Sequence, residues 1–379
     1  MTAAITITTP WNGDVLNRHD GTVTPAGLAI DVRGQAPDGL PITVTCEGAM
    51  GAGTPPARCS QVTTTARGGE YAATLPLQGR HNTITAATGQ HRASIRVLWD
   101  KDSRPRYRFS VDDNILLLKD LAESGYASLF EHWYLAFWRG LHQRYGTKVH
   151  LNIYYRTDES VYSGATFALP EMPDRFRAEW QANAGWLHLT FHARSNKPDW
   201  PYREATYGRM AADYEAVTNE IRRFAGEETL SSFTTVHWAS APRPAVCALR
   251  ERGIRGLIGL FYQQTHGSAT NTAYYLAPEL AAHVAGRDYW WDPDLDMAFV
   301  SCDAVVNSYP LDAIVPRLDV VGGNAHTGEL IELLIHEQYF RRELPIHQAD
   351  VQERVVRAVE WVAERGYKPV FWGEGFVGT

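Results

Sequence analysis

The sequence predicts an all-β sandwich followed by an α/β barrel, and three observations support this division. Across residues 1–98, short runs rich in Thr, Val and Ile alternate with clusters of Gly, Pro, Asn and Asp, which is the pattern of a small antiparallel sandwich. From residue 107 onward, strand-like runs alternate with long segments of helical periodicity. This alternation indicates a mostly parallel sheet that helices close, or nearly close, into a barrel. The short charged segment 100–106 contains a proline and predicts a linker.

The first domain, expected to span residues 1–98, is interpreted as an accessory module. Its predicted strands are 5–8, 28–32, 42–45, 71–75, 83–86 and 93–98. The segment LPLQGRHNTI at residues 75–84 resembles a turn of the immunoglobulin-like modules that are appended to carbohydrate-active enzymes. Because no cluster of catalytic residue types falls in this domain, a packing or positioning role is favoured over an independent sugar-binding site.

The second domain is expected to span residues 107–379. Its predicted strands are 107–113, 149–155, 187–192, 233–237, 257–261, 297–300, 331–336 and 369–372. Apolar residues at helical spacing predict helices over 114–145, 203–225, 243–252 and 349–365. In a parallel barrel the carboxyl ends of the strands converge on one face, where the active site lies. Residues at strand ends therefore carry the functional prediction.

Composition excludes several classes of function. The net charge of −7 argues against a nucleic acid or an anionic membrane as the main partner. No leader and no apolar run of membrane-spanning length is visible, so a cytoplasmic location is expected unless a leader has been removed. The cysteines lack metal-type spacing and are expected to be reduced; they are Cys46, Cys59, Cys247 and Cys302.

Side chains that can bind a metal or transfer a proton follow several predicted strands. They are Asp112 and Asp113, His192, His237, and His336 with Glu337. Two imidazoles with one carboxylate are a common ligand set for a catalytic divalent ion. Of two adjacent carboxylates, one can hold the ion while the other accepts a proton from the water it activates. The alternative is that Asp113 or Asn114 simply caps the following helix.

The segment FSVDDN at residues 109–114 resembles the first motif, T-F-D-D-G, of polysaccharide deacetylases of the NodB-homology type. The segment LLIH at 333–336 looks like the late motif of that family, an apolar strand that ends in a histidine. The resemblance implies an irregular (β/α) barrel of about seven strands. It further implies that Asp112 is a general base, that Asp113 is a metal ligand and that His336 is a general acid. Zinc is the expected ion.

The chain departs from that family at two points. Asn114 stands where the motif has Gly, and the second motif, H-[S/T]-x-x-H, is matched in spacing only by His188 and His192. On a strand these two imidazoles would lie about 13 Å apart and could not share an ion. We therefore interpret His188 as a residue of the barrel interior, and expect His192 and His237 to complete the metal site with Asp113.

Further polar and aromatic residues near strand ends are expected to contact a substrate, with surface solvation or core packing as the alternative. These are Arg156, Trp200, Tyr202, Trp238, Asp303, Glu337 and Glu374. The segment 290–294, WWDPD, reads as an aromatic loop that could form one wall of a sugar site.

These observations predict a metal-dependent carbohydrate-active hydrolase that removes acyl groups, such as acetyl, from a saccharide. One alternative keeps the metal and the barrel but changes the reaction to glycoside hydrolysis, lysis or isomerisation; Asp303, Glu337 and Glu374 favour it. A second alternative is a sugar-binding protein without catalysis, in which the carboxylate pair is only a cap. A saccharide is the expected partner, and homo-oligomerisation is left open.

Overall fold

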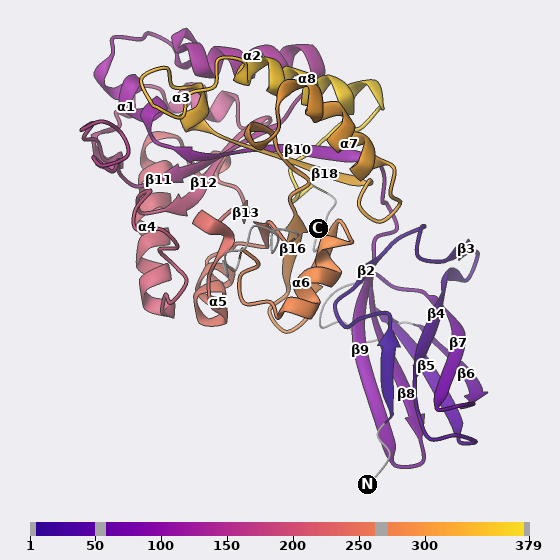
Figure 1. The fold of residues 1–379 in the computed structure, drawn as a ribbon. Helices are drawn as coiled ribbons and strands as arrows, with labels where there is room; N and C mark the ends of the chain where they lie inside the picture. The colour runs from indigo at the N-terminus through magenta and orange to yellow at the C-terminus, as the bar shows by residue number, and fades with distance from the viewer. Residues whose placement is uncertain (1–4, 50–57, 262–271, 375–379) are drawn as a thin grey trace. The chain divides into compact units, whose positions relative to one another are not determined.

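The computed structural model describes residues 5–49, 58–261 and 272–374, which fall into two compact units. The first unit comprises the chain up to Ser103 together with Tyr289–Ala298, and the second comprises Arg104–Asp288 and Phe299–Glu374. The predicted fold class is confirmed, because antiparallel sandwich sheets precede a parallel β/α region consistent with an irregular barrel (Figure 1). Within the described residues, no helix is long and apolar enough to cross a membrane.

The first unit is a sandwich of two sheets with an apolar interior. One sheet has the order β1–β4–β3, with β7 beside β4, and the other has the order β2–β9–β8–β5–β6. Side chains alternate between buried and exposed along β4, β5 and β7, as expected for strands with one face on a core. The bounds are β1 Thr6–Thr9, β2 Val15–Leu16, β3 Thr22–Thr24, β4 Gly27–Gln35, β5 Pro41–Ala49, β6 Arg58–Thr65, β7 Glu70–Leu77, β8 His81–Thr88 and β9 His91–Trp99.

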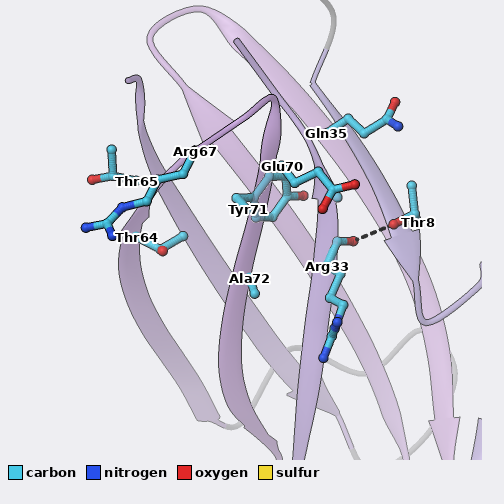
Figure 2. Close-up of a pocket in the computed structure, with 10 residues that line it drawn as sticks. Thr8, Arg33, Gln35, Thr64, Thr65, Arg67, Glu70, Tyr71 and Ala72 are labelled. Atoms are coloured by element: carbon cyan, nitrogen blue, oxygen red, sulfur yellow. Dashed lines mark hydrogen bonds between the residues drawn. The ribbon is translucent and has the colours of Figure 1, made fainter. Parts of the chain in front are cut away.

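A polar cavity of about 540 Å³ lies on the sandwich (Figure 2). Its lining includes Arg33, Arg67 and Glu70, and the hydroxyl of Tyr71 donates a hydrogen bond of 2.8 Å to the carbonyl oxygen of Thr6. This cavity contains none of the predicted site residues. The accessory role of this domain remains a proposal.

Residues 290–294, interpreted from the sequence as an aromatic loop that could form one wall of a sugar site, instead belong to a hairpin of the first unit. Trp290 and Trp291 lie on β15 (Tyr289–Asp292) and are almost completely buried. The indole of Trp290 donates to the carbonyl oxygen of Asn12 at 2.8 Å, and the amide of Trp291 donates to that of Gly13 at 3.0 Å. A Cβ atom on Gly13 would lie 2.2 Å from the carbonyl oxygen of Trp291, so this close approach requires glycine.

The second unit contains a parallel sheet of order β12–β11–β10–β18–β17, with β19 beside β10, and a second sheet in which β14 lies between β13 and β16. A single bridge between Leu189 and Leu230 connects the region of β12 to the approach of β13, so the barrel is interrupted rather than continuously bonded. The bounds are β10 Arg106–Asn114, β11 Val149–Tyr154, β12 Leu187–Ala193, β13 Phe233–Thr234, β14 Gly256–Gly259, β16 Met297–Ser301, β17 Ala304–Val305, β18 Leu330–His336 and β19 Lys368–Pro369.

Helices surround these strands, and α2, α7 and α8 lie over one side of β10 and β18 (Figure 1). The predicted helical stretch 114–145 is broken into α1 and α2, because the chain turns at Ser124 and Gly125 and restarts in a short 3₁₀ turn, in which the side chain of Ser128 accepts a hydrogen bond from the amide of Phe130. The bounds are α1 Leu116–Glu123, α2 Trp133–Tyr145, α3 Arg177–Ala182, α4 Tyr207–Phe224, α5 Arg243–Glu251, α6 Pro278–Ala285, α7 Ile314–Gly322 and α8 Val351–Glu364.

A buried ion pair fixes β10 against β18. The guanidinium of Arg108 donates to both carboxylate oxygens of Glu332, at 2.7 and 2.9 Å, and both side chains are completely buried. Ser110 and Trp372 donate to the same carboxylate, at 2.9 and 2.7 Å. Because the residues of β10 and β18 pair in unbroken register, this ion pair also sets Asp112 beside His336 at the ends of the two strands.

Candidate metal centre

The two carboxylates reach the site through an irregularity in β10. The register between β10 and β11 shifts between Val111 and Asn114, and Asp113 has the left-handed φ of 66°. Regular alternation would send neighbouring side chains to opposite faces, whereas a bulge redirects them. Asn114 supports the irregularity by donating to the carbonyl oxygens of Val111 and Asn152 at 2.6 and 3.1 Å.

The first turn of α1 is capped by another residue, so the carboxylate pair is not a helix cap. The amides of Ile115, Leu116 and Leu117 all donate to the carboxylate of Glu337, at 2.8, 3.0 and 2.7 Å. Arg341 pairs with the same buried carboxylate. Neither Asp113 nor Asn114 is therefore needed to satisfy these amides.

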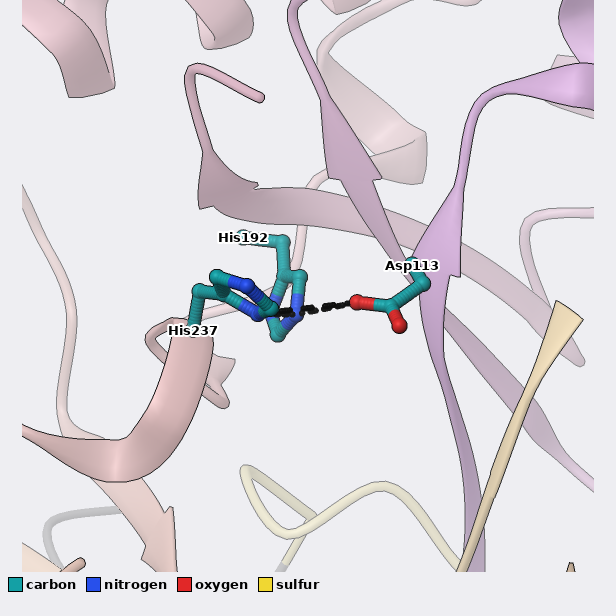
Figure 3. A group of neighbouring side chains, drawn as sticks. All are labelled: Asp113, His192 and His237. Carbon is teal, nitrogen blue, oxygen red and sulfur yellow. Dashed lines mark hydrogen bonds and ion pairs between the residues drawn. The ribbon is translucent and has the colours of Figure 1, made fainter. Parts of the chain in front are cut away.

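Asp113, His192 and His237 converge from three segments of the chain (Figure 3). Asp113 comes from β10, His192 from β12 and His237 from the 3₁₀ turn after β13. The Nε2 atom of His192 lies 3.1 Å from Oδ1 of Asp113, and Nδ1 of His237 lies 3.1 Å from that Nε2 and 3.5 Å from that Oδ1. All three side chains are buried.

The outer nitrogen of each imidazole faces a group that can only accept a hydrogen bond. Nδ1 of His192 lies 2.5 Å from the carbonyl oxygen of Thr235, and Nε2 of His237 lies 3.1 Å from that of Asn196. These nitrogens must therefore carry the protons, which leaves lone pairs on the inner nitrogens when the rings are neutral. Two such nitrogens and a carboxylate oxygen then face one another.

This arrangement fits a divalent metal ion. A tetrahedral zinc site with ligand bonds of about 2.0–2.1 Å separates neighbouring ligand atoms by roughly 3.3 Å. The separations of 3.1, 3.1 and 3.5 Å match that spacing. Hydrogen bonds from the outer ring nitrogens to backbone carbonyls are also the usual means of orienting metal-binding histidines. The buried cluster of Asp113, His192 and His237 could thus bind a metal ion.

The carboxylates of Asp112 and Asp113 have opposite electrostatic character. Burial raises the pKa of Asp112 above its ordinary value, and the nearby imidazoles of His192 and His336 only partly oppose this effect. Burial would also raise the pKa of Asp113, but the hydrogen bond with His192 and the nearby imidazoles lower it well below the usual range. Two adjacent carboxyl groups with separated pKa values are suited to different roles.

The imidazoles respond to the same surroundings. Burial would lower the pKa of His192, but the charges of Asp112 and Asp113 raise it above its ordinary value. For His237 burial prevails, and it lowers the pKa to about 4. The imidazole of His237 is thus neutral near neutral pH.

Asp112 and His336 face the same cavity, which has a volume of about 450 Å³. The amide of Asn152 donates to Oδ1 of Asp112 at 2.5 Å. His336 ends β18, and its Nδ1 lies 2.9 Å from the side-chain oxygen of Asn307. The structure therefore brings all five predicted catalytic and metal-binding residues to one cavity, which is lined by Asp112, Asp113, His192, His237 and His336 among others.

Of the two tryptophans predicted to contact a substrate, Trp238 lines this cavity, and Trp200 packs against Trp238 without being part of the described lining. Trp238 is 39% exposed, and its ring centroid lies 4.7 Å from that of Trp200. Both residues have left-handed backbone conformations, with φ of 66° and 48°. Such conformations are costly for bulky residues, by about 1–3 kcal/mol each, and are concentrated at functional sites.

The remaining predicted substrate contacts, like Trp200, are not part of the described lining of the cavity. Tyr202 is buried and donates to Asp213 at 3.1 Å, and Asp303 accepts from the amide of Glu332 at 2.8 Å. Glu374 accepts from Lys148 and from the amide of Phe371. The remaining two are Arg156, whose backbone bridges to Ala168, and Glu337, which caps α1.

His188 lies at the opposite end of β12 from His192 and is not part of the metal-competent cluster. Its imidazole stacks on the ring of Phe371, with centroids 3.6 Å apart and planes within 5°. Burial lowers the pKa of His188 to about 4. This position agrees with the interpretation of His188 as an interior residue.

Several residues of the site were not predicted, among them Asn152, Tyr154 and Asn307. Asn152 and Tyr154 contact Asp112 and Asp113, respectively, and Asn307 contacts His336. A signal for the first two is present in the sequence, because the fully buried strand β11 carries polar groups at every second position from His150. Burial raises the pKa of Tyr154 well above its ordinary value, so its hydroxyl remains a hydrogen-bond donor.

No protein-family model and no curated protein matches this chain. Weak similarities exist to solved structures of carbohydrate-active proteins. A β-glucuronidase of Faecalibacterium prausnitzii is 9% identical, with a TM-score of 0.29 over 96% of this chain and 66% of that chain. A cycloisomaltooligosaccharide glucanotransferase of Paenibacillus sp., solved with cycloisomaltoheptaose, is 9% identical, with a TM-score of 0.25 over 85% of this chain and 53% of that chain.

A glycosyl hydrolase family 2 member of Bacteroides cellulosilyticus is likewise 9% identical, with a TM-score of 0.24 over 88% of this chain and 46% of that chain. The chain thus spans 66% or less of the length of these three proteins. None of the three is a deacetylase by name. At these TM-scores the similarity carries no argument about fold or function, and no family assignment follows.

Proposed function

We propose that this protein is a metal-dependent hydrolase that removes acyl groups from a saccharide. The observation that carries the proposal is the division of the carboxylate pair. Asp113 belongs to the cluster that fits a metal ion, whereas Asp112 lies outside that cluster and faces the same cavity. The likeness of residues 109–114 and 333–336 to deacetylase motifs supports acyl transfer to water as the reaction.

A divalent ion held by Asp113, His192 and His237 would supply Lewis acidity and an acidified water molecule. Asp112, which burial makes a stronger base than an ordinary aspartate, takes the proton of the attacking water. The oxygen of that water forms a bond to the acyl carbon, and the bond from the acyl carbon to the sugar oxygen or nitrogen breaks. His336 donates a proton to the departing atom, so the products are a carboxylic acid and the deacylated sugar.

The aromatic pair at the cavity supports a saccharide as the substrate. A pyranose ring presents an apolar face of C–H groups that can cover an aromatic ring, while its hydroxyl groups remain available for hydrogen bonds. Trp238 offers such a ring at the cavity beside His237, and Trp200 packs against the ring of Trp238. Lys197 and Asp199 provide polar groups on the same lining.

The proposal is tested with partially acetylated amino sugars and acetylated glycans, the metal being supplied as Zn²⁺ or Co²⁺. Acetate release in a coupled assay and exchange of an acetyl group for hydrogen in the product mass are expected. Both signals should fall by about 10²-fold or more in Asp112→Asn and should disappear in wild-type protein treated with chelator. Sugar products of unchanged mass from every acetylated substrate would overturn the proposal.

Cleavage of a glycosidic bond is the second candidate. It is retained because Asp199 gives the cavity a second carboxylate besides Asp112 that lies outside the metal cluster, and glycosidases act with a pair of carboxyl groups. Asp303, Glu337 and Glu374, whose positions in the sequence favoured this reaction, do not line the cavity in its described part. Products of shorter chain length that retain their acetyl groups would select this candidate.

A further inference from the structure

Tyr154 occupies a central position in the metal-competent cluster, although neither the sequence motifs nor the mechanism above uses it. It ends β11 and is fully buried. Its ring centroid lies 5.1 Å from that of His192 and 5.3 Å from that of His237. The phenol ring therefore packs against both imidazoles, and its hydroxyl group is directed toward the ligand atoms.

The contacts of this hydroxyl show where its proton goes. The oxygen accepts a hydrogen bond of 3.2 Å from the side-chain amide of Asn196. It lies 3.0 Å from Nδ1 and 3.2 Å from Nε2 of His237. An oxygen almost equidistant from both ring nitrogens lies beside the carbon between them, so it points well at neither. The hydroxyl instead donates to Oδ1 of Asp113, which is the ligand oxygen that faces His192.

We propose that Tyr154 is a positioning residue of the metal site, whose hydroxyl holds Oδ1 of Asp113 toward His192 and His237 without itself binding the ion. Asp113 requires such a restraint because its backbone is in the left-handed region and its neighbour Asp112 faces the same cavity. A carboxylate oxygen has lone pairs for both the phenol and an ion. Partners of this kind typically contribute 10- to 100-fold to metal affinity. The inference rests on the proposed metal site.

The test compares Tyr154→Phe with Tyr107→Phe. Both changes remove one buried hydroxyl and keep the ring, and both residues lie on neighbouring strands, but the hydroxyl of Tyr107 contacts Thr147 at 3.0 Å, far along β10 from Asp113. Zn²⁺ and Co²⁺ affinities are measured by competition with a chromophoric chelator. Affinity should fall about 10- to 100-fold in Tyr154→Phe and stay within about 2-fold of wild type in Tyr107→Phe.

Two further measurements separate positioning from other roles. The visible spectrum of bound Co²⁺ should report the same coordination number in Tyr154→Phe as in wild type; a changed coordination number would make Tyr154 a ligand and overturn the inference. The melting temperature of metal-free Tyr154→Phe should be the lower of the two, because this variant loses the hydrogen bonds with Asp113 and Asn196, whereas Tyr107→Phe loses the one with Thr147; affinities are compared at a temperature at which both variants are folded. If Tyr154→Phe does not fold, Asn196→Ala, which removes the donor to the phenol oxygen, should weaken affinity by a smaller factor.

The outcomes distinguish this inference from the proposed function. Wild-type protein that binds metal, with equal affinity in both tyrosine variants, overturns the role of Tyr154 and leaves the metal site intact. Wild-type protein that binds none of Zn²⁺, Co²⁺ and Ni²⁺ overturns the site and the inference together. Weak binding in Tyr154→Phe but normal binding in Tyr107→Phe supports the positioning role, whichever reaction the cavity performs.

Discussion

The two units of the molecule bury their interiors in different ways. In the sandwich, the inward residues of β5, such as Val44, are apolar and completely buried. In the barrel unit, β10 and its neighbours bury polar residues on a shared side. Arg108 contacts His150 on β11, and Ser110 contacts Glu332 on β18. All four of these side chains are completely buried.

This difference indicates that the functional site lies in the barrel unit. An apolar interior is stabilised by burial itself and needs no partner molecule. A polar interior is costly unless each group is paired. Along β10 the pairing is complete at Arg108 and Ser110, but at the end of the strand Asp113 meets two imidazoles whose inner nitrogens are acceptors. When both rings are neutral, a metal ion could supply positive charge at that point.

The largest expected effect is loss of the bound ion. It tests whether the polar residues at the strand ends bind metal, whereas the buried polar residues farther from the strand ends do not. His192→Ala should reduce bound metal to background, because it removes one of three ligand atoms from the cluster. His188 lies on the same strand but outside the cluster. The His188→Ala variant should therefore bind metal like the wild type. Elemental analysis of protein purified without chelator makes the comparison. Equal metal content in the two variants would contradict the assigned site.

A second prediction compares an ion pair from each unit. Glu332→Leu leaves the guanidinium of Arg108 buried without its counter-charge, and should lower the free energy of unfolding of the barrel unit by about 3–5 kcal/mol. Arg96→Leu removes the exposed pair with Asp294 in the first unit, and should cost at most about 1 kcal/mol. Urea titrations with separate transitions fitted for the two units provide the measurement. A similar small loss for both would show that the polar interior is not held by this pair.

The third prediction separates the two carboxylates. Asp112→Asn should retain metal and lose rate by about 10²-fold or more, because proton transfer is impaired while the ligands remain. Asp113→Asn should lose metal, since Oδ1 of Asp113 is one of the three atoms proposed to bind the ion. Metal analysis and single-turnover rates are measured on both variants. Metal retained in Asp113→Asn and lost in Asp112→Asn would mean that the roles are reversed.

The fourth prediction concerns pH. Burial, with the neighbouring charge of Arg108, lowers the pKa of His150 well below its ordinary value, so the folded state binds this proton less readily than the unfolded chain. The corresponding stability is present above the unfolded pKa of about 6.5 and is lost as pH falls from there toward the folded pKa, by up to about 1.4 kcal/mol per pH unit. His150→Gln should flatten this dependence. An unchanged slope in urea titrations between pH 7 and pH 5 would contradict it.

Sequence reasoning predicted that Asp113, His192 and His237 lie together, because strand ends meet at one face of a barrel and this rule needs only strand positions. It did not predict the bulge at Asp113, which depends on the register with β11. It also placed Glu337 at the cavity, because this residue follows a strand end. Position in the sequence does not reveal that the amides of α1 donate to its carboxylate. The burial of Trp290 likewise depends on Asn12, which is remote in sequence.

The smallest expected effect concerns the aromatic surface at the cavity. It tests whether a sugar substrate contacts the ring of Trp238 beside the polar residues of the barrel unit. Trp238→Ala should raise KM about 2- to 10-fold with little change in kcat, because an aromatic contact is worth about 0.5–1.5 kcal/mol beyond its buried area and the reacting groups are untouched. Trp133→Ala is the control, since Trp133 is similarly exposed, at 41% against 39%, but lines a different cavity. Steady-state kinetics on acetylated oligosaccharides of increasing length should show a loss that is larger for longer substrates. If KM is unchanged at every length, the sugar does not lie on Trp238, and the aromatic pair serves only to shape the loop that carries His237.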